Sequence, residues 1–324
     1  MYSLVIPVYR NEESLPALLE AVTGLAKKLD GLEVVFVVDG SPDRCFELLR
    51  DALPKASFRS KLLAHSRNFG SFAAIRTGLA AASGRYFAVM AADLQEPIEL
   101  VEQFFHVLAK DEADVVVGQR TSRNDPAGSS AASQLFWWLY RKAINPAIPA
   151  GGVDVFGCNQ LVLKALLALE ENNSSLVAQL FWVGFRVKPL PYERLARAAG
   201  RSAWTLKKKV RYLLDSVYSF TDLPIRLLTL IGAVAMFLSL VVGTTVFLSW
   251  LTGRIAVPGY TPIVLTVVFF GGLNAFGLGI IGDYVWRAYE NTKRRPTAIV
   301  AAQLDFGQSE GLGSVTELPA RKTL

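Results

Sequence analysis

The sequence predicts an α/β domain followed by a helical hairpin that enters a membrane. Up to residue 120, short runs of Val, Ile and Phe alternate with segments in which apolar residues recur every three or four positions. This alternation is typical of a mostly parallel sheet flanked by helices. Nearer the C-terminus, the apolar stretches Leu227–Trp250 and Thr261–Trp286 are each longer than the ~20 residues that a helix needs to cross a bilayer.

The elements of the α/β domain follow from these patterns in chain order. The expected strands are Ser3–Val8, Glu33–Val38, Leu62–His65, Tyr86–Met90, Asp114–Gly118 and Val187–Tyr192. The expected helices are Ser14–Leu29, Arg44–Ala52, Phe72–Ala82, Ile98–Lys110, Phe136–Ile144, Leu161–Leu169 and Leu176–Val183. Because ligands bind beyond the carboxyl ends of the strands in such sheets, the residues that follow the strands form the candidate site.

The basic residues near the hairpin lie before its first span and after its second. They are Lys207, Lys208, Lys209, Arg211, Arg226, Arg287, Lys293, Arg294 and Arg295. The connecting loop, Leu251–Tyr260, carries only Arg254. By the positive-inside rule, both chain ends face the cytoplasm, which predicts a multi-pass protein of the bacterial inner membrane.

Four regions are expected along the chain. Residues 1–204 form a cytoplasmic domain, and residues 205–226 form a juxtamembrane interfacial helix. Residues 227–286 form the transmembrane hairpin, with spans at 227–250 and 261–286. Residues 287–324 form a cytoplasmic tail, which is expected to be disordered from about Gln308.

Composition and missing motifs exclude several classes of protein. Two cysteines without CxxC spacing and two histidines without HxxxH spacing argue against a disulfide framework and a histidine-ligated metal centre. No GxGxxG follows the first strand, and GxxxxGK[ST] is absent, so dinucleotide-binding and P-loop domains are disfavoured. Nucleic acid is not an expected partner. The hydrophobic content of 52% agrees with membrane insertion.

Polar residues follow two of the expected strands. Asp39 and Ser41 lie in a turn, where Asp39 either caps the next helix or accepts hydrogen bonds from a nucleotide base or ribose. Asp93 and Gln95 follow the fourth strand, and their oxygens suit Mg²⁺ held together with a substrate diphosphate. The alternative for Asp93 is a helix cap.

Five segments in order carry a specific resemblance. They are Val5–Tyr9 with Asn11–Glu13, Val38–Asp43, His65–Gly70, Ala92–Pro97, and Gly282–Tyr284 with Arg287, Tyr289, Glu290, Arg295 and Pro296. Together with the hairpin, they resemble the family-2 glycosyltransferases of the GT-A fold. The similar subgroup comprises dolichol-phosphate mannosyltransferases and bactoprenol-phosphate glucosyltransferases. The resemblance covers nearly the whole chain.

The resemblance implies a nucleotide-sugar donor, UDP- or GDP-linked, with Mg²⁺ or Mn²⁺ and a polyprenyl-phosphate acceptor. It implies inverting in-line transfer by a homo-oligomer, a tetramer in related proteins. The expected nucleotide-sugar residues are Pro7, Tyr9, Glu12, Asp39, Ser41, Arg67, Ala92 and Asp93. The expected metal ligands are Asp93 and Gln95, and the catalytic group is Asp154, Asp93 and Arg120. The expected lipid-phosphate residues are Arg123, Arg201, Ser202 and Lys207, with the alternative, favoured for the lysines at 207–209, that they meet anionic lipid headgroups.

The role expected for Asp154 is to position the acceptor or the metal, because a phosphate nucleophile with a second pKa of ~6 is already largely ionised at neutral pH. The alternative is a turn Asp satisfied by the backbone. Truncation after Leu223 is expected to reduce transfer to lipid far more than nucleotide binding.

Three positions depart from the family pattern. Ala91 replaces the first Asp of the metal motif, Ser71 replaces a Lys, and Ala203 replaces a second Lys that Arg201 compensates in part. These departures leave open a catalytically impaired relative that acts as a membrane scaffold or a lipid-binding subunit. A processive polysaccharide synthase is a further alternative, although the chain lacks a QxxRW element and additional spans.

Overall fold

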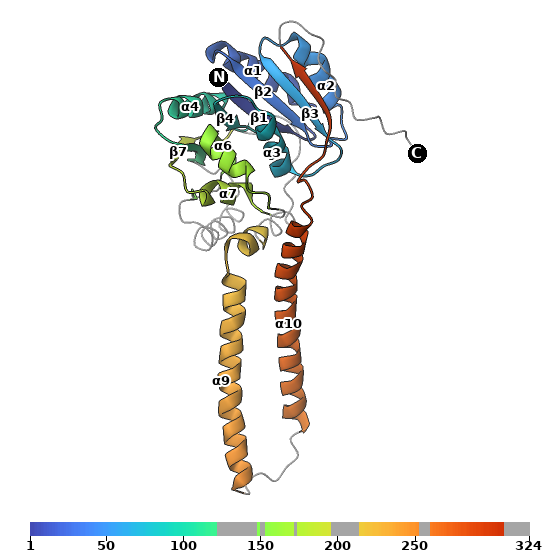
Figure 1. The fold of residues 1–324 in the computed structure, drawn as a ribbon, viewed down its shortest axis with the longest axis vertical. Helices are drawn as coiled ribbons and strands as arrows, with labels where there is room; N and C mark the ends of the chain where they lie inside the picture. The colour runs from blue at the N-terminus through green and yellow to red at the C-terminus, as the bar shows by residue number, and fades with distance from the viewer. Residues whose placement is uncertain (122–147, 150–152, 172–173, 196–213, 253–259, 308–324) are drawn as a thin grey trace, which may run out of the picture.

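The computed structural model describes residues 1–121, 148–149, 153–171, 174–195, 214–252 and 260–307. An α/β domain carries two long helices that extend away from it, as Figure 1 shows. The predicted helix Phe136–Ile144 lies outside the described residues, as does the part of the predicted interfacial helix before Leu214.

One mixed sheet forms the centre of the domain. Its strands, in spatial order, are β7 (Val187–Tyr192), β5 (Val115–Arg120), β6 (Phe156–Asn159), β4 (Tyr86–Val89), β1 (Tyr2–Val8), β2 (Leu32–Val38), β3 (Arg59–His65) and β8 (Val300–Phe306). The strands β1 to β4 pair in parallel, and β5 pairs in parallel with β7. The strands β6 and β8 are antiparallel to their neighbours, so the predicted mostly parallel sheet is in fact mixed.

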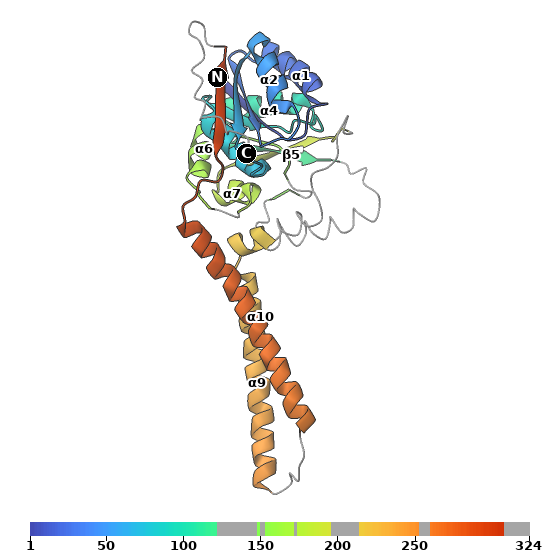
Figure 2. The ribbon, with the colours of Figure 1, turned by 90° about the vertical axis from the view of Figure 1, so that its right-hand side faces the viewer.

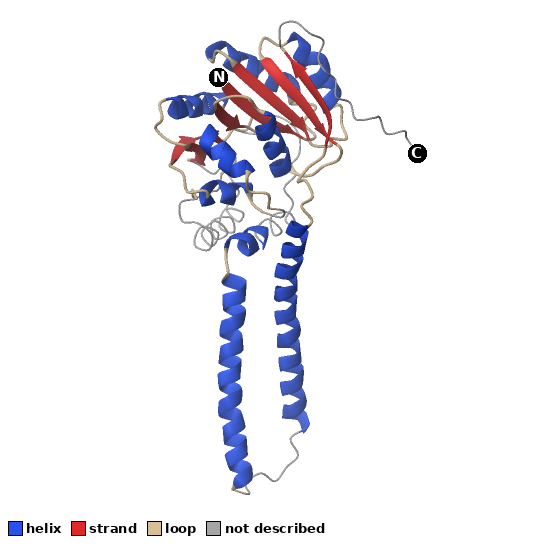
Figure 3. Ribbon diagram, in the orientation of Figure 1, coloured by secondary structure: helices blue, strands red, loops and turns tan. Residues whose placement is uncertain are grey.

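Helices cover both faces of this sheet (Figure 3). They are α1 (Leu15–Lys28), α2 (Cys45–Ala52), α3 (Ser71–Ala81), α4 (Ile98–Ala109), α6 (Gln160–Leu167) and α7 (Leu176–Trp182), with the short turn η1 (Leu53–Lys55) after α2. All seven residues of β2 are buried, because alternate side chains enter two separate hydrophobic clusters. Helix α3 packs closely through Gly78, where a Cβ atom would lie 2.3 Å from Val5 Cγ1.

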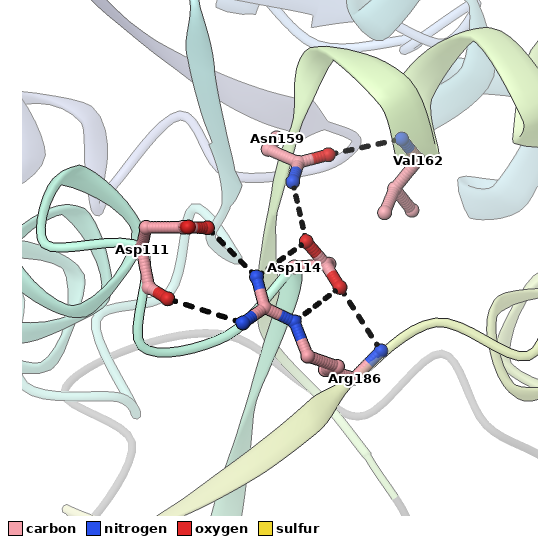
Figure 4. Close-up of polar contacts among 5 residues, drawn as sticks. All are labelled: Asp111, Asp114, Asn159, Val162 and Arg186. Atoms are coloured by element: carbon pink, nitrogen blue, oxygen red, sulfur yellow. Dashed lines mark hydrogen bonds and ion pairs between the residues drawn. The ribbon is translucent and has the colours of Figure 1, made fainter.

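A polar network fixes the edge of the sheet opposite to the carboxyl ends of the parallel strands. Arg186 precedes β7 and donates from Nε to Asp114 Oδ2 over 2.9 Å and from Nη2 to Asp111 Oδ1 over 2.7 Å (Figure 4). Asn159 donates to Asp114 Oδ1 over 2.9 Å and accepts from the Val162 amide at the start of α6. These contacts join β5, β6 and β7, so we assign Arg186 a structural role.

The two long helices coincide with the stretches predicted to span a membrane. Helix α9 (Leu223–Leu251) and helix α10 (Tyr260–Thr292) run beside each other in both views (Figures 1 and 2). Large apolar side chains are exposed along them, including Phe237 at 65% and Leu278 at 68%. Within the described residues, no single helix meets the length and hydropathy criteria for a membrane span. The helix Leu214–Phe220 and Leu223–Ala235 meet them only as a pair bent by 79°.

The helix Leu214–Phe220 is fastened to the last turns of α10. Arg287 Nη2 donates to Asp215 Oδ1 over 2.8 Å, and Tyr284 donates to the carbonyl oxygen of Thr221 over 3.3 Å. The rings of Tyr218 and Tyr284 meet edge to face, with centroids 5.1 Å apart. The segment that precedes α9 therefore contacts the C-terminal part of α10.

The strand β8 was not predicted. It follows α10 and pairs with β3, with Leu304 opposite Leu62 and Ala302 opposite Ala64. The region expected to be a cytoplasmic tail thus contributes residues 300–306 to the sheet. Its start at Val300 lies beside His65, the carboxyl end of β3, so the long helices lie nearest to the carboxyl edge of the sheet.

Candidate active site

The carboxyl ends of six strands meet at one edge of the sheet. These strands are β1, β2, β3, β4, β5 and β7, because the antiparallel β6 between β4 and β5 restores the common direction. The polar residues singled out in the sequence follow these strand ends. We call this edge, with the loops that follow its strands, the site edge.

A sharp turn follows β4 at Asp93, Leu94 and Gln95. Leu94 adopts φ 53°, a left-handed conformation that costs a non-glycine residue about 1–2 kcal/mol. The residue before the turn, Ala92, is buried, and its carbonyl oxygen accepts a hydrogen bond from Ser14 Oγ over 3.0 Å. The start of α1 therefore supports the turn that carries the predicted metal ligands.

Asp154, Arg120 and Tyr192 form a compact cluster at the site edge. Arg120 Nη2 forms an ion pair with Asp154 Oδ2, and the Tyr192 hydroxyl donates to the same oxygen over 3.1 Å. Burial, followed by the charge of Asp154, raises the pKa of Tyr192, so its hydroxyl stays protonated and able to donate. Two of the predicted catalytic residues thus come together, and two donors fix the position of the Asp154 carboxylate.

Glu96 and Arg194 join this cluster, and the sequence motifs indicate a role for neither. Glu96 is 2% exposed, and burial, then the charges of Asp154 and Asp93, raise its pKa to about 7. Arg194 Nη2 donates to Gln95 Oε1 over 2.7 Å, and its Nε lies 3.9 Å from Glu96 Oε1. Arg194 lies two residues after the predicted strand Val187–Tyr192, but placing it at the site also requires that strand to pair in parallel with β5.

Asp39 organises the loop that follows β3. It is 2% exposed, and its carboxylate accepts the backbone N–H groups of Phe69 and Gly70, each over 2.8 Å. His65 Nδ1 lies 2.8 Å from Asp39 Oδ1. Gly40 has φ 57°, and a Cβ there would lie 2.2 Å from the carbonyl carbon of Arg67. The predicted contact of Asp39 with a nucleobase remains a prediction.

The loops after β1 and β2 are tied together. Arg44 donates to the Glu12 carboxylate from its backbone N–H over 3.1 Å and from Nη2 over 2.6 Å. These bonds, the backbone bond first, lower the pKa of Glu12. Ser41 Oγ accepts from the Arg10 amide over 2.8 Å and donates to Asp43 Oδ1 over 2.6 Å.

The other predicted nucleotide residues lie at or just after the carboxyl ends of β1 and β3. Pro7 is near the end of β1, Tyr9 follows it, and the Arg67 guanidinium lies 3.9 Å from the centre of the Phe69 ring. The predicted lipid-phosphate residues Arg123, Arg201, Ser202 and Lys207 fall outside the described residues, so their prediction stays untested.

A divalent metal ion at the site edge would need coordinating atoms from a bound substrate in addition to those of the protein. Among the described residues, no group of three or more His, Cys, Asp or Glu side chains is arranged to hold a metal ion. Asp93 offers one carboxylate, and the side-chain oxygen of Gln95 already accepts from Arg194. Mg²⁺ commonly takes one or two carboxylates, substrate phosphates and water, so Asp93 suits an ion that arrives with a diphosphate.

Comparison with known proteins places the chain in a family. Residues 3–169 match the family model described as glycosyl transferase family 2. The chain is 33% identical over 301 residues to the CsbB protein of Bacillus subtilis (strain 168), covering 93% of this chain and 91% of that one. It is 31% identical over 302 residues to the prophage bactoprenol glucosyl transferase homolog of Escherichia coli (strain K12), covering 92% and 97%. The same values hold for the bactoprenol glucosyl transferase of Shigella phage SfV. The chain therefore belongs to glycosyl transferase family 2 and is a glycosyltransferase with a GT-A fold.

Proposed function

We propose that this glycosyltransferase moves a sugar from a UDP- or GDP-linked donor to polyprenyl phosphate at the cytoplasmic face of a bacterial inner membrane. The observation that carries the proposal is the position of the site edge. It is the edge of the sheet nearest to α9 and α10 (Figure 1), and the segment after α10 reaches it where Val300 pairs with His65. The relatives named bactoprenol glucosyl transferase support the same acceptor.

The long helices set the depth of the site in this proposal. Their exposed apolar side chains would lie in the bilayer as a transmembrane hairpin, with the helix Leu214–Phe220 at the interface. The acceptor's phosphate lies at headgroup depth, so a site edge that faces the membrane can meet it. A homo-oligomer, tetrameric by resemblance, belongs to the proposal as well.

The proposed reaction is a single in-line displacement that inverts the anomeric carbon. An oxygen of the lipid phosphate forms a bond to that carbon as the bond to the nucleoside diphosphate breaks. Because the phosphate is already ionised, the site needs little base, and Arg120 and Tyr192 hold Asp154 where it can position the acceptor. A Mg²⁺ or Mn²⁺ ion at Asp93 would supply neutralisation of the leaving diphosphate.

The test uses purified protein in detergent with undecaprenyl phosphate, Mg²⁺ or Mn²⁺, and a panel of radiolabelled nucleotide sugars. Label that moves into the organic phase from one donor, and only with metal, supports the proposal and identifies the sugar. Such transfer would also show that Ala91 is compatible with catalysis. If no donor gives transfer and no nucleotide binds, the proposal fails and an inactive scaffold is favoured.

A further inference from the structure

Two arginines that follow strands at the site edge differ in what they contact. Arg120 ends β5 and pairs directly with the Asp154 carboxylate. Arg194 follows β7 and donates to the neutral side-chain oxygen of Gln95. The Arg194 side chain is 33% exposed, compared with 16% for Arg120. Arg194 is therefore the better placed of these two to offer positive charge to a ligand.

The nearest carboxylate does not engage Arg194 closely. Glu96 Oε1 lies 3.9 Å from Arg194 Nε, which is beyond hydrogen-bonding distance. The only hydrogen bond of the Arg194 guanidinium among the described residues is the one to Gln95. A neutral amide oxygen binds a guanidinium less strongly than an anionic oxygen does. A phosphate oxygen can therefore replace Gln95 at a net gain.

The backbone holds Arg194 next to the turn at Asp93–Gln95. The carbonyl oxygen of Tyr192 accepts from the Thr121 amide over 3.0 Å and from the Thr121 hydroxyl over 3.1 Å. On the other side, the Leu195 amide donates to the Gln95 carbonyl oxygen over 2.9 Å. Because bonds on both sides fix the segment, little ordering is needed when a ligand arrives.

We infer that Arg194 binds the terminal phosphate of the donor's nucleoside diphosphate, exchanging its bond to Gln95 for bonds to phosphate oxygens. The inference rests on the proposed function, which supplies the nucleotide donor. The planar guanidinium can grip two phosphate oxygens at once. The diphosphate is assigned in preference to the acceptor's phosphate because Arg194 contacts the turn where the diphosphate is proposed to lie. During transfer, Arg194 stabilises the negative charge that develops on the departing oxygen.

The experiment measures binding without turnover. Full-length protein in detergent is titrated by calorimetry with UDP, UMP, GDP and GMP, in Mn²⁺ and again in EDTA. The wild-type protein is expected to bind one diphosphate more tightly than its monophosphate. Arg194→Gln should weaken diphosphate binding at least tenfold and monophosphate binding less than twofold. The loss should persist in EDTA, because the contact is direct, and Arg194→Lys should recover part of it.

Arg186→Gln is the matched control, because Arg186 immediately precedes the first residue of β7 and its contacts are structural. It should lower thermal stability and leave the preference for diphosphate unchanged.

Equal losses of diphosphate and monophosphate affinity in Arg194→Gln would overturn the inference and indicate a structural role. A loss seen only with Mn²⁺ would overturn it in favour of an effect through Gln95. Unchanged diphosphate affinity in Arg194→Gln would overturn the inference, and a raised KM for polyprenyl phosphate in the transfer assay would then assign Arg194 to the acceptor. If wild-type protein binds none of these nucleotides, the proposed function itself fails.

Discussion

Asp39 Oδ1 and His65 Nδ1 lie 2.8 Å apart, and this contact connects the turn after β2 to the strand that pairs with the C-terminal β8. His65 stands opposite Val300, and the neighbouring Ser66 amide donates to the carbonyl oxygen of Ile299 over 3.0 Å. The segment after α10 thus contacts His65 and Ser66, and His65 in turn contacts Asp39. The long helices and the proposed nucleotide site are joined through the sheet.

A chain that ends at Thr292 should therefore bind nucleotide at least tenfold more weakly than the full chain. It loses β8, which leaves β3 without its outer partner and His65 with less support. A chain that ends at Gly307 keeps β8 and is the matched control. Calorimetric titration with nucleotide and thermal unfolding check both chains.

This result would revise the expectation for truncation after Leu223, since that truncation removes β8 together with the hairpin. Nucleotide binding and lipid transfer should then fall together. If the chain ending at Thr292 keeps full nucleotide affinity, β8 pairs with the edge of the sheet but does not support the nucleotide site.

Gly40→Ala should lower the free energy of unfolding by roughly 3 kcal/mol and weaken nucleotide binding. The substitution places a side chain on a backbone with φ 57° and a Cβ atom 2.2 Å from the carbonyl carbon of Arg67. Gly24→Ala in α1 is the control, because nothing lies within 4 Å of its Cβ and Ala favours a helix. Chemical denaturation checks both. A Gly40→Ala protein as stable as the Gly24→Ala protein would contradict the close approach of the two loops.

Much of the α/β domain could be predicted because its central strands are buried on both faces and read as unbroken apolar runs. The strand β2 shows this, with every residue buried. The two missed strands lack that signal. The strand β6 is four residues long and contains Gly157 and Asn159, while β8 follows a long apolar helix and mixes Ala, Gln and Asp. Only its pairing with β3 makes β8 a strand.

Some residues of the candidate site could likewise be predicted from the sequence, and others could not. Asp93, Arg120 and Asp154 were predicted because they match short motifs, and the structure brings Arg120 and Asp154 into contact. Tyr192 and Arg194 were not assigned, because their role depends on β7 running parallel to β5 at the far side of the sheet. That pairing joins segments about 70 residues apart, and local sequence patterns do not reveal such pairings.

Tyr192→Phe should lower kcat roughly tenfold and leave nucleotide affinity unchanged. It keeps the buried ring and removes the hydroxyl that donates to Asp154, a bond to a charged group worth about 1.5 kcal/mol. Tyr86→Phe in β4 is the control, because Tyr86 lies at the opposite edge of the sheet. Steady-state transfer assays and calorimetry separate the two effects. An unchanged kcat would show that Arg120 alone is enough to hold Asp154.

Ionisation of Glu96 should lower the stability of the folded protein as the pH rises from 5 to 8. Its pKa is raised from 4.5 to about 7 in the folded protein, so the folded state holds a proton that the unfolded state has released. This stabilisation is complete below pH 4.5 and is lost as the pH rises through 7. The melting temperature of wild type minus that of Glu96→Gln, measured in EDTA, should therefore fall across this range.

Glu33→Gln is the control for that series. Burial alone would raise the pKa of Glu33, but hydrogen bonds from Ser3 and Ser83 and the charge of Lys61 lower it. Its stabilisation is present above the unfolded pKa and lost only as the pH falls through the lower folded value. The melting temperature of wild type minus that of Glu33→Gln should therefore stay constant from pH 5 to 8. The same flat profile for Glu96→Gln would show that Glu96 is ionised throughout.

Asp93→Ala should abolish metal-dependent transfer even at saturating Mg²⁺ or Mn²⁺. With Ala at position 91 and Gln95 bonded to Arg194, the proposed metal site depends on the Asp93 carboxylate of this turn. Glu99→Ala removes an exposed acid from the first turn of α4 and should leave transfer unchanged. A Mn²⁺ titration of transfer checks both variants. If the Asp93→Ala protein reaches the wild-type rate at high Mn²⁺, the ion is held by the diphosphate alone, and the assignment of Asp93 as a metal ligand is wrong.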